Sequence, residues 1–507
     1  MPRSYYDAVV LGTDLAPLLC AAQLARRGLR VLVLGQGVPE ASYELDGVEL
    51  DRQSRPFVGL SSPAVSQALE ELALKQVMRQ RSWLPERPLQ LLLPSQRIDV
   101  SPDPSTWSGE LAREVPEVRR RAEDVSRTLT EVRAELDALC GQGLIWPPET
   151  FVEKQRFAMA SAGQRFDRHG HGWTSWDQLP REHPLRLAFS LCLQFTAELP
   201  MGQHSQATRA RLFGHLLAGL QRVEQRWPGM QRLLFDRIRS WGGEVRSNDR
   251  AELIEPGLGG SHILRLARSD EEVGAGQLVH GAAVSELTQL LTGRGGVEPV
   301  FERAGEPRPR AYRYTAHFLL ERSGVPEALA SQALLLPDPG SEERALWLEQ
   351  REVDETRSLI TVSRLIDAHF LEAEPAQLKD MRNQALAALR TIIPFIDESL
   401  IWLDSPHDGL PPQSVNGERE LRCSDPWTRG PATMQAVYEY PTRRALGVCG
   451  LPTRTALRTV FLCNRQVCPG LGFEGAFLTA SSVSRILASR YKRQSWLRRG
   501  RWASANV

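Results

Sequence analysis

Apolar and polar positions over the first 35 residues predict a strand, a helix and a second strand. Residues 6–11 (YDAVVL) have the unbroken apolar character of a buried parallel strand, and residues 15–27 have the periodicity of an amphipathic helix that ends at Gly28. Residues 29–34 (LRVLVL) form the next apolar run. A strand, a helix and a strand within about 30 residues predict a βαβ unit of an α/β fold.

The pattern further along predicts a second lobe. Residues 83–224 are mainly helical in character and include a charged amphipathic stretch over 110–139, while residues 310–321, 334–336 and 357–366 read as strands before a helix over 374–393. A hairpin over 46–51, a helix over 228–239 and a strand at 242–245 are expected beside the first unit. At 507 residues the chain is long enough for two or three lobes.

The turn between the first strand and helix is where a dinucleotide-binding unit places G-x-G-x-x-G, so that a pyrophosphate meets free N–H groups at the helix start. Here Gly12 is the first glycine, Asp14 stands at the second position and Pro17 at the third. A carboxylate at the second position repels a phosphate. Asp14 is also a favourable N-cap, and Pro17 is tolerated in a first helical turn.

Two interpretations of this turn stay open. In one, Gly12, Thr13 and Asp14 still contact the cofactor, and Gln36 takes the place of the acidic residue that would hold the ribose after the second strand. In the other, the unit is purely structural and the carboxylate of Asp14 replaces the phosphate.

The segment 459–486 carries a more specific resemblance. It begins as an apolar strand, passes through a Pro/Gly turn and continues as a helix that starts near Gly475. This resembles the second flavin motif of phytoene desaturases and the related flavin amine oxidases, through Pro469, Gly470, Leu471, Gly472, Glu474, Gly475 and Ala476. The family's Gly-Asp pair reads Cys463-Asn464 here, so a hydrogen-bonding group is kept and the charge is lost.

The resemblance implies an α/β fold of the glutathione-reductase class. A Rossmann-like FAD- or NAD(P)-binding domain would be built from residues 1–82, 225–300 and 440–490, and an α+β substrate domain with a helical cap from residues 83–224 and 301–439. It also implies FAD as cofactor, with Gly12, Thr13, Asp14 and Gln36 at its AMP end, Asn464 at its middle and residues 470–476 at its ring. No catalytic acid or base is evident.

The composition of the chain bears on its partners, its location and the presence of a metal site. With 62 basic and 61 acidic residues the chain has almost no net charge, which disfavours nucleic acid as a partner. Seven scattered cysteines and the lack of a leader or spanning segment favour a cytoplasmic protein without a disulfide framework. His169 and His171 in a glycine-rich stretch read as a surface turn, so no metal site is expected.

The C-terminal tail, residues 491–507, differs from the rest. Residues 490–502 hold six basic and no acidic residues, with Tyr491, Trp496 and Trp502 among them. This composition suits an anionic membrane surface at the inner face of the membrane, and it equally suits an ordinary solvated end.

Two hypotheses for function follow. The first is an FAD-dependent oxidoreductase that removes a hydride from an apolar, isoprenoid-like substrate. The second is a non-catalytic relative that has lost the cofactor through Asp14, Pro17, Gly35 and Asn464 and serves as a binding or assembly module. The first is favoured because no structural role for the turn at 469–475 is evident from the sequence.

Overall fold

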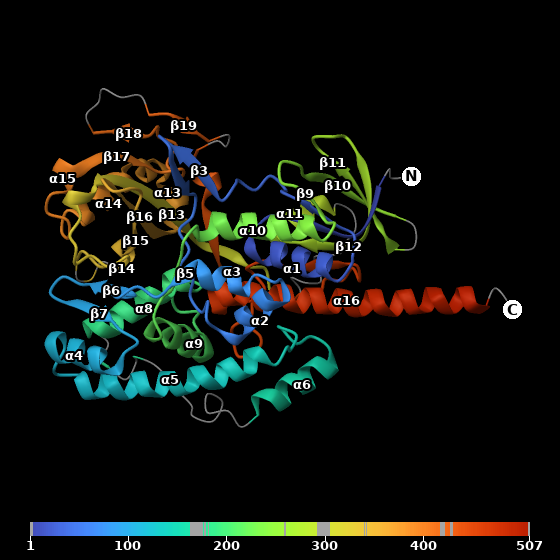
Figure 1. Cartoon of the computed structure of the whole chain (residues 1–507), viewed down its shortest axis with the longest axis horizontal. Coiled ribbons are helices and arrows are strands. Elements are labelled where there is room, and N and C mark those ends of the chain that lie inside the picture. Colours follow the sequence, from blue (N-terminus) through green and yellow to red (C-terminus); the bar gives the residue numbers. More distant parts are fainter. Residues whose placement is uncertain are drawn as a thin grey trace.

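The computed structural model describes residues 4–162, 176, 179–180, 182–257, 260–291, 305–338, 340, 342–415, 421–425 and 429–504. Within these ranges the chain forms two lobes, each built on its own sheet, above a layer of helices that includes α4, α5 and α9 (Figure 1). The expected α/β fold class is confirmed. His169 and His171 lie outside the described residues.

The first lobe is organised around a seven-stranded sheet with the order β10-β11-β12-β1-β2-β9, and β21 pairs with β12. Strands β2, β1, β12 and β21 run parallel, as buried apolar runs require. The strands are β1 (Ser4–Leu11), β2 (Val31–Leu34), β9 (Glu244–Arg246), β10 (Ala251–Pro256), β11 (His262–Leu266), β12 (Glu272–His280) and β21 (Val460–Leu462).

Helix α1 (Leu15–Arg26) is the centre of this lobe. Its residues from Leu15 to Ala25 are all buried, and it packs against α16 (Gly472–Ser504) and α10 (Arg226–Ser240). Gly28, which follows the helix, has φ 81°, a conformation that glycine adopts without strain. The predicted strand, helix and strand of the N-terminal βαβ unit are therefore confirmed to within two residues at each end.

The second lobe contains a nine-stranded sheet with the order β18-β17-β13-β16-β15-β14-β6-β7, and β20 pairs with β13. Its strands are β6 (Leu89–Leu92), β7 (Arg97–Val100), β13 (Arg308–Glu321), β14 (Gln332–Leu335), β15 (Leu346–Glu352), β16 (Arg357–Asp367), β17 (Leu400–Asp404), β18 (Gln413–Ser414) and β20 (Gln435–Glu439). Helices α13 (Ala368–Ala373), α14 (Met381–Leu389) and α15 (Ile396–Ser399) accompany it. The strands predicted from the alternating pattern of this lobe are confirmed.

The remaining elements connect and cap the lobes. A small sheet joins β3 (Ser42–Leu45), β4 (Val48–Asp51) and β19 (Cys423–Ser424), and β5 (Ser82–Trp83) pairs with β8 (Arg222–Val223). The helices are α2 (Pro63–Glu71), α3 (Lys75–Gln80), α4 (Pro104–Glu114), α5 (Arg119–Gly141), α6 (Phe151–Ser161), α8 (Pro184–Thr196), α9 (Gln206–Leu217) and α11 (Val284–Leu290).

Two helix predictions need correction. The charged stretch expected as one helix over 110–139 is split into α4 and α5, because Pro116 cannot continue a helix and α4 ends at Glu114. The helix expected over 374–393 is shorter, since a 3-10 segment (Pro375–Asp380) precedes α14 and the helix stops at Leu389. Among the described helices, none has the length and apolar character needed to cross a bilayer.

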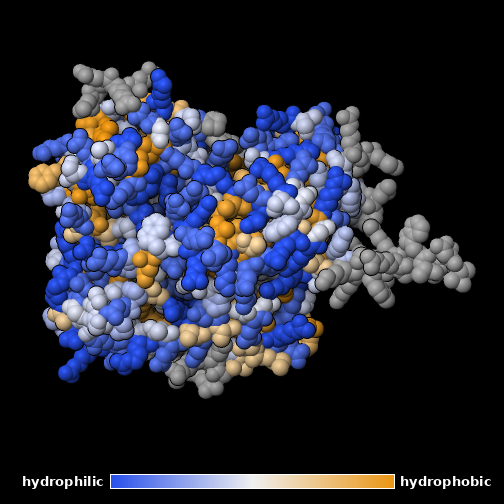
Figure 2. Space-filling model, viewed as in Figure 1, coloured by the Kyte–Doolittle hydropathy of each residue, from blue (hydrophilic) through white to orange (hydrophobic). Residues whose placement is uncertain are grey.

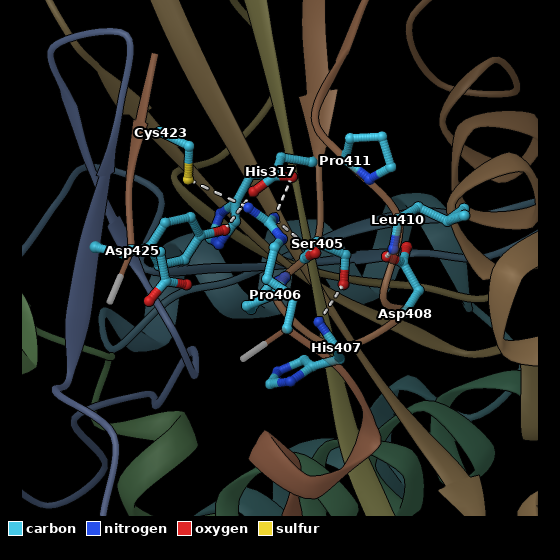
Figure 3. Close-up of polar contacts among 12 residues, drawn as sticks. His317, Ser405, Pro406, His407, Asp408, Leu410, Pro411, Cys423 and Asp425 are labelled. Carbon is cyan, nitrogen blue, oxygen red and sulfur yellow. Dashed lines mark hydrogen bonds and ion pairs between the residues drawn. The ribbon is translucent and has the colours of Figure 1, made fainter. Parts of the chain in front are cut away.

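A buried network of hydrogen bonds and ion pairs connects the β3–β4 hairpin to the second lobe. The Tyr43 hydroxyl donates to Asp404 Oδ2 at 2.6 Å, and Arg429 pairs with the other oxygen of Asp404. Arg382 holds Asp408 through two hydrogen bonds in the turn that follows β17, where Ser405, His407 and Asp408 lie (Figure 3). Every charged group of this network has a partner, so it contributes cohesion between segments and offers no free group for chemistry.

Candidate functional site

The carboxyl ends of four parallel strands meet at one edge of the first sheet, which is where open α/β sheets bind ligands. Leu11 at the end of β1 is in register with Leu34 of β2 and His280 of β12, and His280 is in register with Leu462 of β21. The turn after Leu11 and the segment after Leu462 therefore face one another, as the sequence predicts. A cavity lined by both Asp14 and Gly472 confirms this.

An Arg-Asp-Arg cluster fills the turn where a pyrophosphate would lie. Asp14 Oδ1 accepts hydrogen bonds from the Leu15 backbone N–H at 2.9 Å and from Arg55 Nη1 at 2.7 Å. Its other oxygen accepts from Arg465 Nη2 at 2.6 Å and Nε at 3.1 Å. Asp14 is thus the predicted N-cap, and the two arginines bind it as they would bind a phosphate.

The ionisation of Asp14 matches this role. Burial by itself raises the pKa of Asp14, but the guanidinium groups of Arg465 and Arg55 outweigh burial and hold the pKa well below its usual range. The side chains of Asp14, Arg55 and Arg465 are 16%, 21% and 22% exposed. The carboxylate is therefore a permanent negative charge at the second glycine position.

Pro17, at the third glycine position, and Thr13 also form contacts within the protein. A Cβ added to Gly281, which follows β12, would lie 2.5 Å from Pro17 Cγ, so the proline ring is packed onto this turn. Gly12 has φ 104°, and the Thr13 carbonyl accepts a hydrogen bond from Gln231 Nε2 at 3.0 Å.

Gln36, the residue expected to meet the ribose, and its neighbour Gly35 contact the main chain of the protein instead. Gln36 is buried, its Nε2 donates to the Ala251 carbonyl at 2.9 Å, and its Oε1 accepts from the Ala251 N–H at 3.1 Å. A Cβ added to Gly35 would lie 1.7 Å from the Ser247 carbonyl oxygen. The segment after β9 therefore occupies the space beside the end of β2, and the Gln36 amide is used to pair with β10.

Asn464, which stands for the family's aspartate, is likewise satisfied internally. Its Nδ2 donates to the Ala282 carbonyl at 2.6 Å, and its Oδ1 accepts from the Gln466 N–H at 3.0 Å. Gln466 Oε1 in turn accepts from the Val284 N–H at the start of α11. This chain of bonds joins β21 to the turn after β12 and leaves the Asn464 side chain 2% exposed.

The glycine-rich turn at the start of α16 has a structural explanation. A Cβ at Gly470 would lie 2.5 Å from Thr208 Oγ1, at Gly472 2.0 Å from the Thr196 carbonyl oxygen, and at Gly475 2.1 Å from the Cys468 carbonyl oxygen. Leu471 is buried, while Ala476 lines the cavity described below. The expectation that this motif lacks a structural role is therefore wrong: the glycines allow backbone segments to approach one another.

Glu474 forms a second buried ion pair in this turn. Arg211 on α9 donates to both of its carboxylate oxygens, at 2.7 and 2.8 Å, and both side chains are almost fully buried. Burial raises the pKa of Glu474, but the charges and hydrogen bonds of Arg211 and His215 together outweigh burial, so the pKa lies well below its usual range. The pair connects the start of α16 to α9 in the layer of helices.

Two small cavities border the Asp14 cluster, and both are lined by Asp14, Arg55, Trp227 and Arg465. One measures about 40 Å³ and is walled by Phe57, Phe195, Phe473 and Arg313 among others. The other measures about 70 Å³. Sites for drug-sized ligands typically measure roughly 300–1,000 Å³. Both cavities beside the Asp14 cluster are therefore well below that size.

The sequence did not reveal the arginines that complete these contacts. Arg55, Arg211, Arg313 and Arg465 come from four separate segments, and only Arg465 lies next to a predicted site residue. Its position directly after Asn464 is the one signal that could have found it. Within the described ranges no cluster of three metal-ligating side chains is found.

Comparison with known proteins identifies the fold. No protein-family model matches the chain, and no curated protein matches it in sequence. An oxidoreductase from Methanosarcina mazei superposes with a TM-score of 0.60 at 13% identity, over 94% of this chain and 99% of that one. Putrescine oxidase bound to putrescine gives 0.56 at 14% identity, and cyclohexylamine oxidase from Brevibacterium oxydans 0.54 at 12% identity, each over 96% of this chain and 99% of the other.

These matches confirm the predicted amine oxidase resemblance at the level of the fold, and at such identities they establish the fold alone. An FAD implied by that fold can be tested against the residues present. A phosphate would meet the carboxylate of Asp14, the ribose would meet a paired Gln36, and the ring would meet a cavity of about 40 Å³. The side chains in this arrangement do not fit FAD.

Proposed function

We propose that the chain is a non-catalytic relative of the flavin amine oxidase fold, in which an internal ion cluster has replaced the cofactor's pyrophosphate and the fold serves as a binding or assembly module. The observation that carries the proposal is the placement of Asp14 between Arg55 and Arg465. The carboxylate of Asp14 occupies hydrogen-bond donors of both guanidinium groups, in the place where a phosphate would otherwise accept them.

The other predicted cofactor positions support the same conclusion. The polar side-chain atoms of Gln36 and Asn464 form hydrogen bonds with backbone groups, and the glycines from 470 to 475 lie close to other atoms of the protein. These polar atoms are satisfied within the protein, and none of them requires a ligand as its partner. Their combination is consistent with a fold retained for its shape.

The direct test is an FAD titration of the purified full chain, monitored by quenching of flavin fluorescence and by calorimetry. The proposal expects no saturable binding at micromolar FAD. A matched variant, Asp14→Gly with Pro17→Gly, restores two glycines of the dinucleotide motif and serves as the comparison. Saturable binding by the unmodified chain would overturn the proposal.

A second candidate is FAD-dependent oxidation of an apolar substrate, because the matches to two amine oxidases extend over 96% of the chain. In this case the Asp14 cluster would have to open when FAD binds. Phe57, Phe195 and Phe473 would then supply an apolar wall. The same titration separates the two candidates.

The C-terminal tail is a further proposal about location. Helix α16 continues to Ser504 and projects beyond the first lobe (Figure 1), and the side chains of residues 492–504 lie outside the described part. The face in Figure 2 is mainly hydrophilic, with apolar patches scattered over it. We propose that the six basic residues within 490–502 bring the protein to anionic membranes.

A further inference from the structure

A cavity of about 340 Å³, which we call the α14 cavity, lies between the sheet of the second lobe and α14. Its walls are formed by residues of β13, β15, β16 and α14 and of the loops beside them. Sites for small-molecule ligands measure roughly 300–1,000 Å³. The α14 cavity therefore has the size of a site for a small ligand, whereas the two cavities beside the Asp14 cluster do not.

The α14 cavity lies on the opposite face of the sheet from the Asp14 cluster. Arg313 and Tyr314 are consecutive on β13, so their side chains point to opposite faces. Arg313 lines the cavity beside Asp14, whereas Tyr314 lines the α14 cavity. Arg364 on β16 is in register with Tyr314 and lines the α14 cavity as well. A ligand in this cavity would therefore be separate from the groove of the first lobe.

Most of the wall of the α14 cavity is apolar. Leu346 and Val362 form part of the sheet side, and Ala385 and Ala388 form part of the helix side. All four belong to one cluster of buried apolar side chains. Because alanine side chains are short, α14 leaves space above the sheet. A molecule of about ten non-hydrogen atoms would fill it, since one water molecule takes about 30 Å³ in the liquid.

Arg364 supplies hydrogen-bond donors to this cavity. Its Nε donates to the Glu343 carbonyl at 3.0 Å, and its Nη1 donates to Gln384 Oε1 at 2.7 Å and to Met381 Sδ at 3.3 Å. Among the described residues, no acceptor is found for Nη2 and no carboxylate forms an ion pair with Arg364. A guanidinium group has five N–H donors, so Arg364 keeps two of them for a ligand.

The charges around the α14 cavity balance one another. Arg344 pairs with Asp338 at 3.3 Å, and both residues line the cavity. Burial and the charge of Arg344 lower the pKa of Arg364, whereas the charge of Glu343 raises it. Two guanidinium groups thus lie near two carboxylates, and no net charge remains that would select an ion.

We propose that the α14 cavity binds a small uncharged molecule with an apolar body and one oxygen acceptor, such as an aromatic ketone, whose oxygen accepts a hydrogen bond from Arg364. The apolar walls bury the body, and the guanidinium group satisfies the oxygen away from bulk water. The three groups that Arg364 already binds are uncharged acceptors too. This inference goes beyond the proposed function, because the site is on the other face of the sheet and holds whether or not FAD binds.

The test is a titration of the full chain with three ligands of similar size, monitored by saturation-transfer difference NMR. Acetophenone has a ring and a carbonyl oxygen, ethylbenzene lacks the oxygen, and benzoate carries a charge. Acetophenone should bind saturably with a Kd below about 1 mM. Ethylbenzene offers Arg364 no acceptor, and benzoate must lose its hydration to enter a site without net charge, so each should bind at least about tenfold more weakly.

Two variants with matched controls place the binding in this cavity. Arg364→Met removes the donors and should weaken acetophenone binding about tenfold, while ethylbenzene binding stays within about twofold. Arg390→Met is its control, because Arg390 follows α14 with an exposed side chain paired to Asp397 at 2.7 Å. Ala388→Phe puts a ring into the cavity and should abolish binding of both ligands. Ala158→Phe, at an exposed position of α6, should not.

Three results would overturn the inference. The first is the absence of saturable acetophenone binding by the unmodified chain. The second is acetophenone binding that survives both Arg364→Met and Ala388→Phe unchanged, because the ligand would then lie elsewhere. The third is tighter binding of benzoate than of acetophenone, because the site would then select an anion.

Discussion

Asp14 Oδ2 lies 2.6 Å from Arg465 Nη2, a contact that joins two residues 451 positions apart in the sequence. It links the first turn of the N-terminal βαβ unit to the segment after β21, directly across the groove of the first lobe. A pyrophosphate held between a helix N-terminus and a neighbouring segment would bridge the same two places. The ion pair therefore holds the two segments together, and it occupies the place that the pyrophosphate of a dinucleotide would need.

Asp14→Asn should lower the free energy of unfolding by about 2 kcal/mol, because it removes the charge that separates two partly buried guanidinium groups. Urea unfolding gives the value. Asp236→Asn is the control, since Asp236 is 74% exposed and lies 3.9 Å from Arg239, and it should change stability by less than about 0.5 kcal/mol. Equal stability of Asp14→Asn and the unmodified chain would contradict the account of the cluster.

Gly475→Ala should lower the free energy of unfolding by at least about 2 kcal/mol, whether or not FAD is present. The added Cβ would lie 2.1 Å from the Cys468 carbonyl oxygen, and backbone atoms cannot move aside cheaply. Gly109→Ala in α4 is the matched helical control, because nothing lies within 4 Å of its Cβ and alanine favours a helix by up to about 1 kcal/mol. If both variants behaved alike, the structural explanation of the turn would be lost.

Stability should fall as the pH is lowered from 6.5 to 5. Burial lowers the pKa of His280 to about 4 and that of His407 to about 3, from a usual value of 6.5. In this window the unfolded chain binds protons that the native chain does not, so each histidine contributes a loss of up to about 1.4 kcal/mol per pH unit. Asp51 acts oppositely: burial raises its pKa to about 6, so its stabilising effect is present at low pH and is lost as the pH rises through 6.

Urea unfolding of His280→Gln between pH 6.5 and 5 isolates one of these contributions. The slope of stability against pH should fall by about 1.4 kcal/mol per unit relative to the unmodified chain. His369→Gln is the control, because the His369 side chain is 79% exposed, and it should leave the slope unchanged. An unaltered slope in His280→Gln would show that His280 titrates normally in the native protein.

The tail should carry the protein to anionic vesicles. Six cationic side chains contribute about 1 kcal/mol each near such a surface, and high salt should weaken the attachment. The measurement is liposome co-sedimentation of the full chain and of a version that ends at Ser489, at low and high salt. If the two forms bind equally, or neither binds, the tail is an ordinary solvated end.

Local signals predicted much of the fold. The strands and helix of the βαβ unit and the Asp14 cap follow from hydrophobic periodicity and capping preference, and the return of residues 459–486 to the first lobe follows from the resemblance to the second flavin motif. Pro116 shows the limit of periodicity, because one residue splits a pattern that otherwise continues from 110 to 139.

The contacts that form the candidate site could not be predicted from the positions of its residues in the sequence. Arg55 and Arg465 give Asp14 its role, and Arg211 gives Glu474 its role, yet each partner lies between 41 and 451 residues away. The glycines after Cys468 read as a flavin motif because the sequence shows which residues lack a side chain and not what approaches them. Only the packed backbone of Thr196 and Cys468 shows that they are needed within the protein.

The visible absorption spectrum tests the central claim most directly. The full chain is purified, incubated with excess FAD and passed through a desalting column, and a known flavoprotein treated in the same way is the positive control. The account predicts a colourless protein without a flavin band, because the side chains of Asp14, Gln36 and Asn464 form their hydrogen bonds with other groups of the protein. A stoichiometric flavin spectrum in the desalted protein would contradict it.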